Sequence, residues 1–340
     1  MRKLLFLLLT SPLFVFAQGD DWGGGDPTPP VTINGLLYKL NAEEYSAKVA
    51  NDNSWEGELV IPERVTYEGN TYIVNKMEWN AFMGCTTLTK IRIPKTVVDI
   101  QAYVGGEECK NPFVGCTSLG SIEVDADNPS ICSVDGVLYS KDKTQLYCYP
   151  GGAKSTSYIV PNTVTWIGAN AFRDCPLQSI EIPNSVLYIS GGAFWSCTKL
   201  ESIRLSENMS RIPAYLFDNC ESLRIIDIPQ SVSSFGGSAF RWTHLNALVV
   251  RGTFSEELRT DIFALTDESM VIYVQRSEIP KFQKVFSGSV RPLEEYTAEI
   301  KSSQVSKTSP TILFDLQGRK VQGQPTRGIY IKNGHKVVIK

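Results

Sequence analysis

The sequence is poor in histidine and in long apolar segments. Among its 340 residues only two are histidines, His244 and His335, which excludes a metal centre built from several histidines and leaves little for histidine-based acid–base catalysis. Beyond the first seventeen residues, no segment offers the about 18 uninterrupted apolar residues that a membrane span requires. The sequence also lacks the phosphate loop Gly-x-x-x-x-Gly-Lys, the zinc helix His-Glu-x-x-His and the nucleophile elbow Gly-x-Ser-x-Gly. We therefore predict no catalytic residue, no cofactor and no metal site.

The charge balance gives no reason to expect a nucleic-acid partner. Lysine and arginine number 33 against 36 aspartate and glutamate, a net charge of -3, whereas proteins that bind a phosphate backbone carry a clear positive excess. The distribution is uneven, because residues 301–340 hold eight Lys and Arg against Asp315 alone. A composition of 42% hydrophobic and 20% charged residues is typical of a folded protein. The positive charge of residues 301–340 distinguishes this segment from the rest of the chain.

Both ends of the chain carry segments outside the expected core. Arg2 and Lys3 precede an apolar run that ends at Ala17, which predicts a secretory signal peptide over residues 1–17; the alternative is an uncleaved membrane anchor. No cysteine follows the cleavage point before Cys85, so we expect export without a lipid and, after cleavage, no transmembrane segment. The glycine- and proline-rich residues 18–30 predict a flexible leader.

The C-terminal segment predicts a small β unit. Residues 291–310 include the serine-rich stretch before Pro310, which is typical of a linker. Residues 311–340 then alternate apolar and polar positions, and Asn333-Gly334 separates two such runs. Asn-Gly between apolar runs is a strong hairpin signal.

Between these ends the sequence repeats itself. The pattern is Ala-Phe-x-x-Cys-x-x-Leu-x-x-Ile-x-Ile-Pro, with small departures from copy to copy. Its phenylalanines stand at 82, 113, 172, 194, 217 and 240, so that the separations are 31, 59, 22, 23 and 23 residues. A period of 22–23 residues is typical of a solenoid.

The apolar positions of each copy alternate, as in a β-strand, and one strand cannot cover its own apolar face. Stacking successive copies as parallel strands supplies the cover. We therefore predict a β-dominated solenoid over residues 81–290, curved, with a parallel sheet on its concave face and an N-terminal β cap over residues 31–80. The 59-residue gap predicts an inserted β meander over residues 128–150. Ser277–Phe286, with apolar residues at helical spacing, predicts a short helix that covers the end.

The eight cysteines are expected to be thiols. Five occupy one inward repeat position, namely Cys85, Cys116, Cys175, Cys197 and Cys220. Small apolar fillers of the core explain this ladder best, and bridges between neighbours or a metal are the alternatives. Cys109 lies off the ladder. Cys132 and Cys148 lie on the first and third runs of the meander, and the strand expected between them argues against a disulfide.

The repeat pattern and the insertion Asp-Gly-Val-Leu-Tyr-Ser-Lys-Asp at 135–142 resemble the BspA-type leucine-rich repeat proteins of anaerobic bacteria over residues 31–290. The segment Leu313–Lys320 with Gly328–Ile331 resembles the C-terminal sorting domain of proteins exported by the type IX secretion system of Bacteroidota. The resemblance implies a secreted or surface-attached protein that binds host matrix or cell-surface proteins, and it implies no shared catalytic residues. The last recognised copy departs from the pattern, with Thr243 in the cysteine position.

A partner is expected on the outward positions of the strands. Between the two isoleucine positions, successive copies present Arg92, Glu123, Glu181, Arg204, Asp227 and Val249, and one step earlier Lys90, Ser121, Ser179, Ser202, Ile225 and Ala247. The bland interpretation is a solvated face with opposite charges paired across strands. The functional interpretation is a partner-binding surface, for which we select Lys90, Arg92, Glu123, Glu181, Arg204 and Asp227.

The predicted function is non-enzymatic adhesion or protein–protein interaction at the outer cell surface. The alternative is a polysaccharide-binding accessory protein, which the lack of exposed aromatics on this face disfavours. A hydrolase would require a deep cleft with two acids. Glu107 and Glu108 are loop acids that no pattern explains, and Asp125–Asn128 fits a turn better than a calcium loop.

Overall fold

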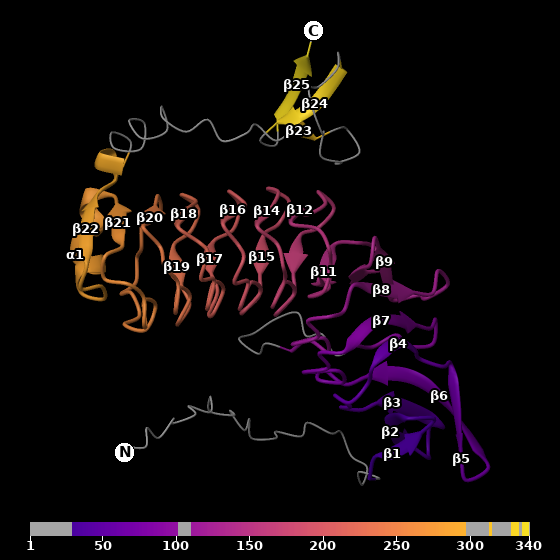
Figure 1. Ribbon diagram of the computed structural model, residues 1–340. Helices are drawn as coiled ribbons and strands as arrows, with labels where there is room; N and C mark the ends of the chain where they lie inside the picture. Colours follow the sequence, from indigo (N-terminus) through magenta and orange to yellow (C-terminus); the bar gives the residue numbers. More distant parts are fainter. Residues whose placement is uncertain (1–28, 101–109, 297–312, 315–327, 333–334, 340) are drawn as a thin grey trace, which may run out of the picture.

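The computed structural model describes residues 29–100, 110–296, 313–314, 328–332 and 335–339. The predicted signal peptide, most of the leader and linker, and Cys109 with Glu107 and Glu108 lie outside these residues. Strands dominate the described part (Figure 1). Within it, no helix has the length and apolar character needed to cross a membrane.

The N-terminal part is a five-stranded sheet whose two edges approach each other. Its strands run in the order β1 (Val31–Ile33), β2 (Leu36–Asn41), β3 (Ser46–Val49), β6 (Asn70–Met77) and β5 (Arg64–Tyr67). The edge strands β1 and β5 touch, so the sheet is curled. Alternate side chains of β6, such as Tyr72, Val74 and Met77, are buried against the first repeats.

The strands of successive repeats pair in parallel, as the apolar alternation predicts. A first row joins β4 (Gly57–Val60), β7 (Leu88–Ile93) and β8 (Ser121–Val124). A second row begins with β12 (Ser157–Ile159), β14 (Ser179–Glu181) and β16 (Ser202–Arg204). Next to β16 it continues with β18 (Ile225–Ile228), β20 (Ala247–Val250), β21 (Val271–Val274) and β22 (Ser289–Pro292).

Short return strands form another set of parallel pairs. They are β13 (Trp166–Ile167) with β15 (Tyr188–Ile189), and β17 (Arg211–Ile212) with β19 (Ser234–Phe235). One residue of each return strand is buried, and these residues occupy the same position of successive repeats: Ile167, Ile189, Ile212 and Phe235. Each repeat therefore contributes apolar side chains to the core from two directions.

The insertion interrupts the parallel rows instead of lying beside one continuous stack. Its strands β9 (Ile131–Val134), β10 (Val137–Ser140) and β11 (Gln145–Cys148) are antiparallel, and β11 pairs in parallel with β13. Strand β10 is buried on both faces: Leu138 packs into the N-terminal core, whereas Val137 and Tyr139 pack into the C-terminal core. Figure 1 shows β7 and β8 lying across the direction of β14 and β16. The insertion therefore divides the interior of the repeat region into two cores.

A column of aromatic rings runs through the C-terminal core. The rings of Phe172, Phe194, Phe217 and Phe240 stack with centroid distances of 5.1, 5.9 and 5.8 Å. Two residues that the repeat pattern did not include extend the column.

Tyr149 stacks on Phe172 at 5.5 Å, and Phe263 stacks on Phe240 at 5.9 Å. Each stands 23 residues from its neighbour in the column. The strands β12 and β21 therefore belong to further copies of the repeat, each with its own aromatic ring in the column. The copies were missed because tyrosine replaces phenylalanine in one, and Gly152 and Thr266 stand in the cysteine position.

The ladder cysteines are buried free thiols, as predicted. They do more than fill space, because each thiol donates a hydrogen bond to a main-chain carbonyl of the preceding repeat. Cys116 donates to Phe82 at 3.1 Å, and Cys197 donates to Phe172 at 2.9 Å. Where Thr243 replaces cysteine, its hydroxyl turns to the carbonyl of Phe240 in its own repeat.

The meander cysteines also follow the prediction. Strand β10 lies between the strands of Cys132 and Cys148, and both residues are free. The Cys132 thiol donates to the carbonyl of Ser140 at 3.2 Å.

The C-terminal end of the second row is covered by a helical segment and by the chain that follows it. A 3-10 turn, η1 (Arg276–Glu278), leads into α1 (Ile279–Gln283), whose Phe282 is fully buried against Phe235 and Phe254. This confirms the predicted end cover, in a shorter form than Ser277–Phe286.

Strand β22 then extends to Pro292, two residues into the range assigned to the linker. The following Leu293 and Tyr296 pack on Ala247, Val249 and Tyr273. Ala247 and Val249, expected to face outward into solvent, are therefore buried.

The C-terminal segment contains an antiparallel sheet. Its strands are β23 (Leu313–Phe314), β24 (Gly328–Lys332) and β25 (His335–Ile339), in that order. Pairing of β24 with β25 in the register Lys332 to His335 agrees with the hairpin signal.

Candidate functional site

The six residues selected from the sequence lie on the parallel strands, and we call them the charged face. The insertion separates them into two groups: Lys90, Arg92 and Glu123 on the first row, and Glu181, Arg204 and Asp227 on the second. Within each row the register places equivalent positions side by side. Arg92 is opposite Glu123, and Glu181 is opposite Arg204.

In the first group one carboxylate forms ion pairs with two basic side chains. Glu123 lies 2.5 Å from Nζ of Lys90 and 2.9 Å from Nε of Arg92. The hydrogen bond from Lys90, aided by the charge of both cations, lowers the pKa of the Glu123 carboxyl. The side chains of Arg92 and Glu123 remain about half exposed, so a partner can reach them.

In the second group the ions form two separate pairs. Arg204 donates to Glu181 at 2.6 Å. Asp227 accepts two hydrogen bonds from Arg251, from Nε at 2.7 Å and from Nη2 at 2.6 Å, and this contact raises the pKa of Arg251.

Arg251 belongs to the charged face but was missed from the sequence. The prediction compared only residues at the same position of each strand, where Val249 stands opposite Asp227. Arg251 lies two residues further along, and diagonal neighbours at that offset are within reach of a long side chain. A search of the sequence for opposite charges at this diagonal offset would have identified Arg251.

The ion pairs of the charged face determine how it can interact with a partner. Exposed ion pairs of this kind contribute only about 0–1 kcal/mol each to stability, so they are a small part of what holds the strands together. They do fix the positions of their side chains. The charged face therefore presents positive and negative groups at fixed positions. Such an arrangement determines the orientation and the specificity of a bound partner more than the strength of binding.

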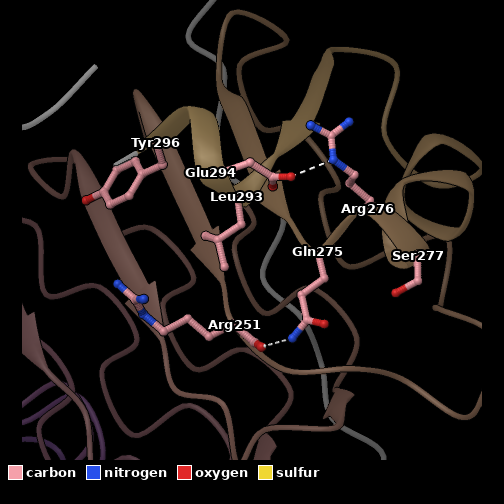
Figure 2. A pocket seen from close by; sticks show the side chains of 7 residues that line it. All are labelled: Arg251, Gln275, Arg276, Ser277, Leu293, Glu294 and Tyr296. Atoms are coloured by element: carbon pink, nitrogen blue, oxygen red, sulfur yellow. Dashed lines mark hydrogen bonds and ion pairs between the residues drawn. The ribbon is translucent and has the colours of Figure 1, made fainter. Parts of the chain in front are cut away.

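A pocket lies at the C-terminal end of the second row, beside the Asp227–Arg251 pair. Its volume is about 580 Å³, a size typical of small-ligand pockets. It is lined by Arg251, Gln275, Arg276, Ser277, Leu293, Glu294 and Tyr296 (Figure 2).

The ends of neighbouring parallel strands build this pocket. Arg251 follows β20, Gln275 follows β21, and Leu293 follows β22. Gln275 donates to the main-chain carbonyl of Arg251 at 2.7 Å, which ties two of these ends together.

Six of the seven residues that line the pocket carry a polar or charged group, and one of them, Glu294, is an acid. Arg276 donates to Glu294 at 2.5 Å, and Leu293 supplies apolar surface. Burial raises the pKa of the Tyr296 hydroxyl, which keeps it protonated and able to donate. The lining does not contain the two acids that a glycosidase mechanism uses.

The Asp125–Asn128 segment is a structural turn. The Asp127 amide donates to the Asp125 carboxylate at 2.8 Å. The buried Asn128 amide donates to the carbonyls of Pro94 and Val97, at 3.0 and 2.8 Å. Among the described residues there is no cluster of three or more His, Cys, Asp or Glu side chains that could bind a metal.

Comparison with known proteins identifies the repeats. The family described as "BspA type Leucine rich repeat region" matches residues 69–133 and 143–267 in six copies, more than half of the chain. The gap between the two matched ranges falls within the insertion. A comparison with curated proteins gives no match.

Similar solved structures come from several bacteria. A leucine-rich cell surface protein from Faecalibacterium prausnitzii is 20% identical, with a TM-score of 0.44, over 78% of this chain and 99% of that one. The pneumococcal vaccine antigen PcpA is 18% identical, with a TM-score of 0.47, over 78% and 98%. A leucine-rich repeat protein from Bacteroides ovatus is 21% identical, with a TM-score of 0.43, over 77% and 67%.

Proposed function

The chain belongs to the BspA-type leucine-rich repeat family, and from this premise we propose that it is a non-enzymatic adhesion or interaction protein of the outer cell surface. The observation that carries the proposal is the charged face, where ion pairs hold exposed side chains in register along parallel strands. Repeat arrays commonly use such extended surfaces to bind other proteins. The partner is a host matrix or cell-surface protein with alternating charges.

We further propose that the parallel rows form the concave side of a curved solenoid. In that geometry the charged side chains converge toward a partner lying in the curve. The pocket beside Arg251 then accepts one side chain of the partner, in the way that interface pockets accept anchor residues.

Export is part of the proposal. Residues 1–17 serve as the signal peptide, and residues 311–340 serve as a sorting domain for type IX secretion in a member of the Bacteroidota. Deleting residues 311–340 then leaves the protein in the periplasm, and surface display of the truncated protein would refute the sorting role.

The binding experiment uses charge reversal. The full chain is tested against a panel of matrix proteins and a panel of glycans, as wild type and as the double variant Arg92→Glu with Arg204→Glu. The matched control is Arg259→Glu, an exposed arginine that is paired with Asp261 away from the charged face.

We expect the double variant to bind its matrix-protein partner at least about tenfold more weakly and the control to bind normally. Unchanged binding by the double variant would reject the charged face. Glycan binding that the reversal abolishes, without any protein binding, would favour the polysaccharide-binding alternative.

A further inference from the structure

A second surface, on the turns that carry the aromatic column, combines aromatic rings with guanidinium groups. Its members are Arg173, Trp195, Tyr215, Arg241 and Trp242, which we call the guanidinium–aromatic ladder. They stand next to, or two residues away from, the column phenylalanines of successive repeats. None of them lies on a parallel strand, so the ladder is distinct from the charged face.

The ladder is continuous from one repeat to the next. The guanidinium of Arg173 lies 3.9 Å from the centroid of the Trp195 ring. That ring stacks on Tyr215 with a centroid distance of 5.6 Å and an interplanar angle of 17°. Arg241 then lies 5.7 Å from Tyr215 and 4.5 Å from Trp242.

Ion pairs hold the ladder in place and cancel its charge. Arg241 donates three hydrogen bonds to Asp218, whose side chain is fully buried, at 2.5, 3.0 and 3.1 Å. Arg173 lies 3.6 Å from Asp174. Because each guanidinium has a carboxylate within ion-pair distance, the charges of the ladder are balanced.

The ladder offers different groups along its length. Trp195 and Tyr215 are partly buried, and neighbours from the preceding and following repeats pack on Trp195. The middle therefore presents ring edges and polar hydrogens. Trp242 is 46% exposed, so the end presents open aromatic surface.

We propose that the guanidinium–aromatic ladder binds a linear, neutral polysaccharide laid along the direction in which the repeats stack. A sugar chain suits the ladder because both are periodic along their length: the ladder adds aromatic or guanidinium groups with each repeat, and each sugar ring adds hydroxyl groups that can pair with guanidinium, phenol and indole hydrogens. The apolar face of a sugar ring packs on Trp242. A neutral ligand is favoured because the ladder has no unbalanced charge to offer an anionic one.

The test is affinity electrophoresis of the full chain in gels that contain hydroxyethyl cellulose, xylan or soluble starch. The variants are Trp242→Ala and the conservative Trp242→Phe. The matched control is Tyr188→Ala, because Tyr188 is a 53% exposed aromatic on β15, outside the ladder. Circular dichroism checks that all variants are folded.

We expect at least one polysaccharide to retard the wild type, Trp242→Ala to weaken binding about tenfold, and Trp242→Phe and Tyr188→Ala to bind nearly as well as wild type. Oligosaccharides should bind more tightly with length up to about four sugar units, one for each repeat in the ladder. The inference is overturned if none of the three polysaccharides retards the wild type, or if Trp242→Ala and Tyr188→Ala behave alike. It is also overturned if Trp242→Ala removes binding to a matrix protein while no polysaccharide binds.

Discussion

Replacing Phe194 by alanine tests whether the repeats depend on the aromatic column. Its side chain is 1% exposed and stacks on Phe172 at 5.1 Å and on Phe217 at 5.9 Å. Truncating a buried phenylalanine costs about 3–5 kcal/mol. Because two aromatic pairs are lost as well, and each is worth about 0.5–1.5 kcal/mol, we expect a cost at the upper end, about 4–5 kcal/mol.

The measurement is urea denaturation, followed by circular dichroism and by intrinsic tryptophan fluorescence, to which Trp195 beside the mutated position contributes together with the five other tryptophans. Phe194→Leu keeps most of the buried area but loses the stacking, so its cost should be about 1–2 kcal/mol. Leu187→Ala is the control, because Leu187 is 43% exposed and its truncation should cost less than about 0.5 kcal/mol.

Transitions that do not coincide between fluorescence and circular dichroism would show that the two probes follow different units, which repeat arrays permit. If Phe194→Ala costs no more than the Leu187→Ala control, the aromatic column does not hold the repeats together, and the stability of the C-terminal core must come from its aliphatic side chains instead.

Three further perturbations test other parts of the structure. Leu138→Ala should lower the free energy of unfolding by about 2–4 kcal/mol and speed amide exchange in the N-terminal core more than in the C-terminal core, since Leu138 packs only into the former; equal changes in both would contradict the division at β10. Iodoacetamide should modify the half-buried Cys132 of the native protein before the buried Cys197, because burial raises the pKa of both thiols but only Cys132 is open to the reagent; equal rates by mass spectrometry would show that the ladder cysteines are not shielded from solvent. In an NMR titration the Glu123 carboxyl should titrate below the usual range for glutamate, and Lys90→Ala should return its pKa toward that range. Since a lowered pKa stabilises the folded state above the usual glutamate pKa and the benefit is lost as pH falls through the lowered value, the wild type should lose more stability in acid than Lys90→Ala.

The sequence was sufficient for the interior of the repeats. Stacking places the same position of every copy in one column, so the core requires similar residues at each period, and the Phe and Cys positions are visible by comparison of the sequence with itself. Parallel pairing followed from the strand alternation and is observed. Tyr149 and Phe263 were missed because their copies depart from the pattern at several positions: Gly152 and Thr266 replace the cysteine, serine replaces the leucine in both copies, and Tyr149 itself replaces phenylalanine.

The sequence indicates an inserted β meander, but it does not show how the insertion affects the cores on either side. Alternation shows that β10 is a strand, whereas its burial on both faces depends on the two cores that pack against it, one built mainly before the insertion and one mainly after it. The same holds for the guanidinium–aromatic ladder. Arg173 and Trp195 occupy equivalent positions in consecutive copies, and no rule of periodicity says that unlike residues there will stack.

The outer surface is where the repeats differ from one another, and the insertion limits how that surface can be used. Since β7 and β8 lie across the direction of β14 and β16 (Figure 1), the two groups of the charged face do not continue one another in a straight line. A rod-like partner therefore contacts one group, whereas a broad partner spans both. The single variants Arg92→Glu and Arg204→Glu separate these cases: binding lost in only one of them identifies the row that is used, and similar losses in both require a partner broad enough to cross the insertion.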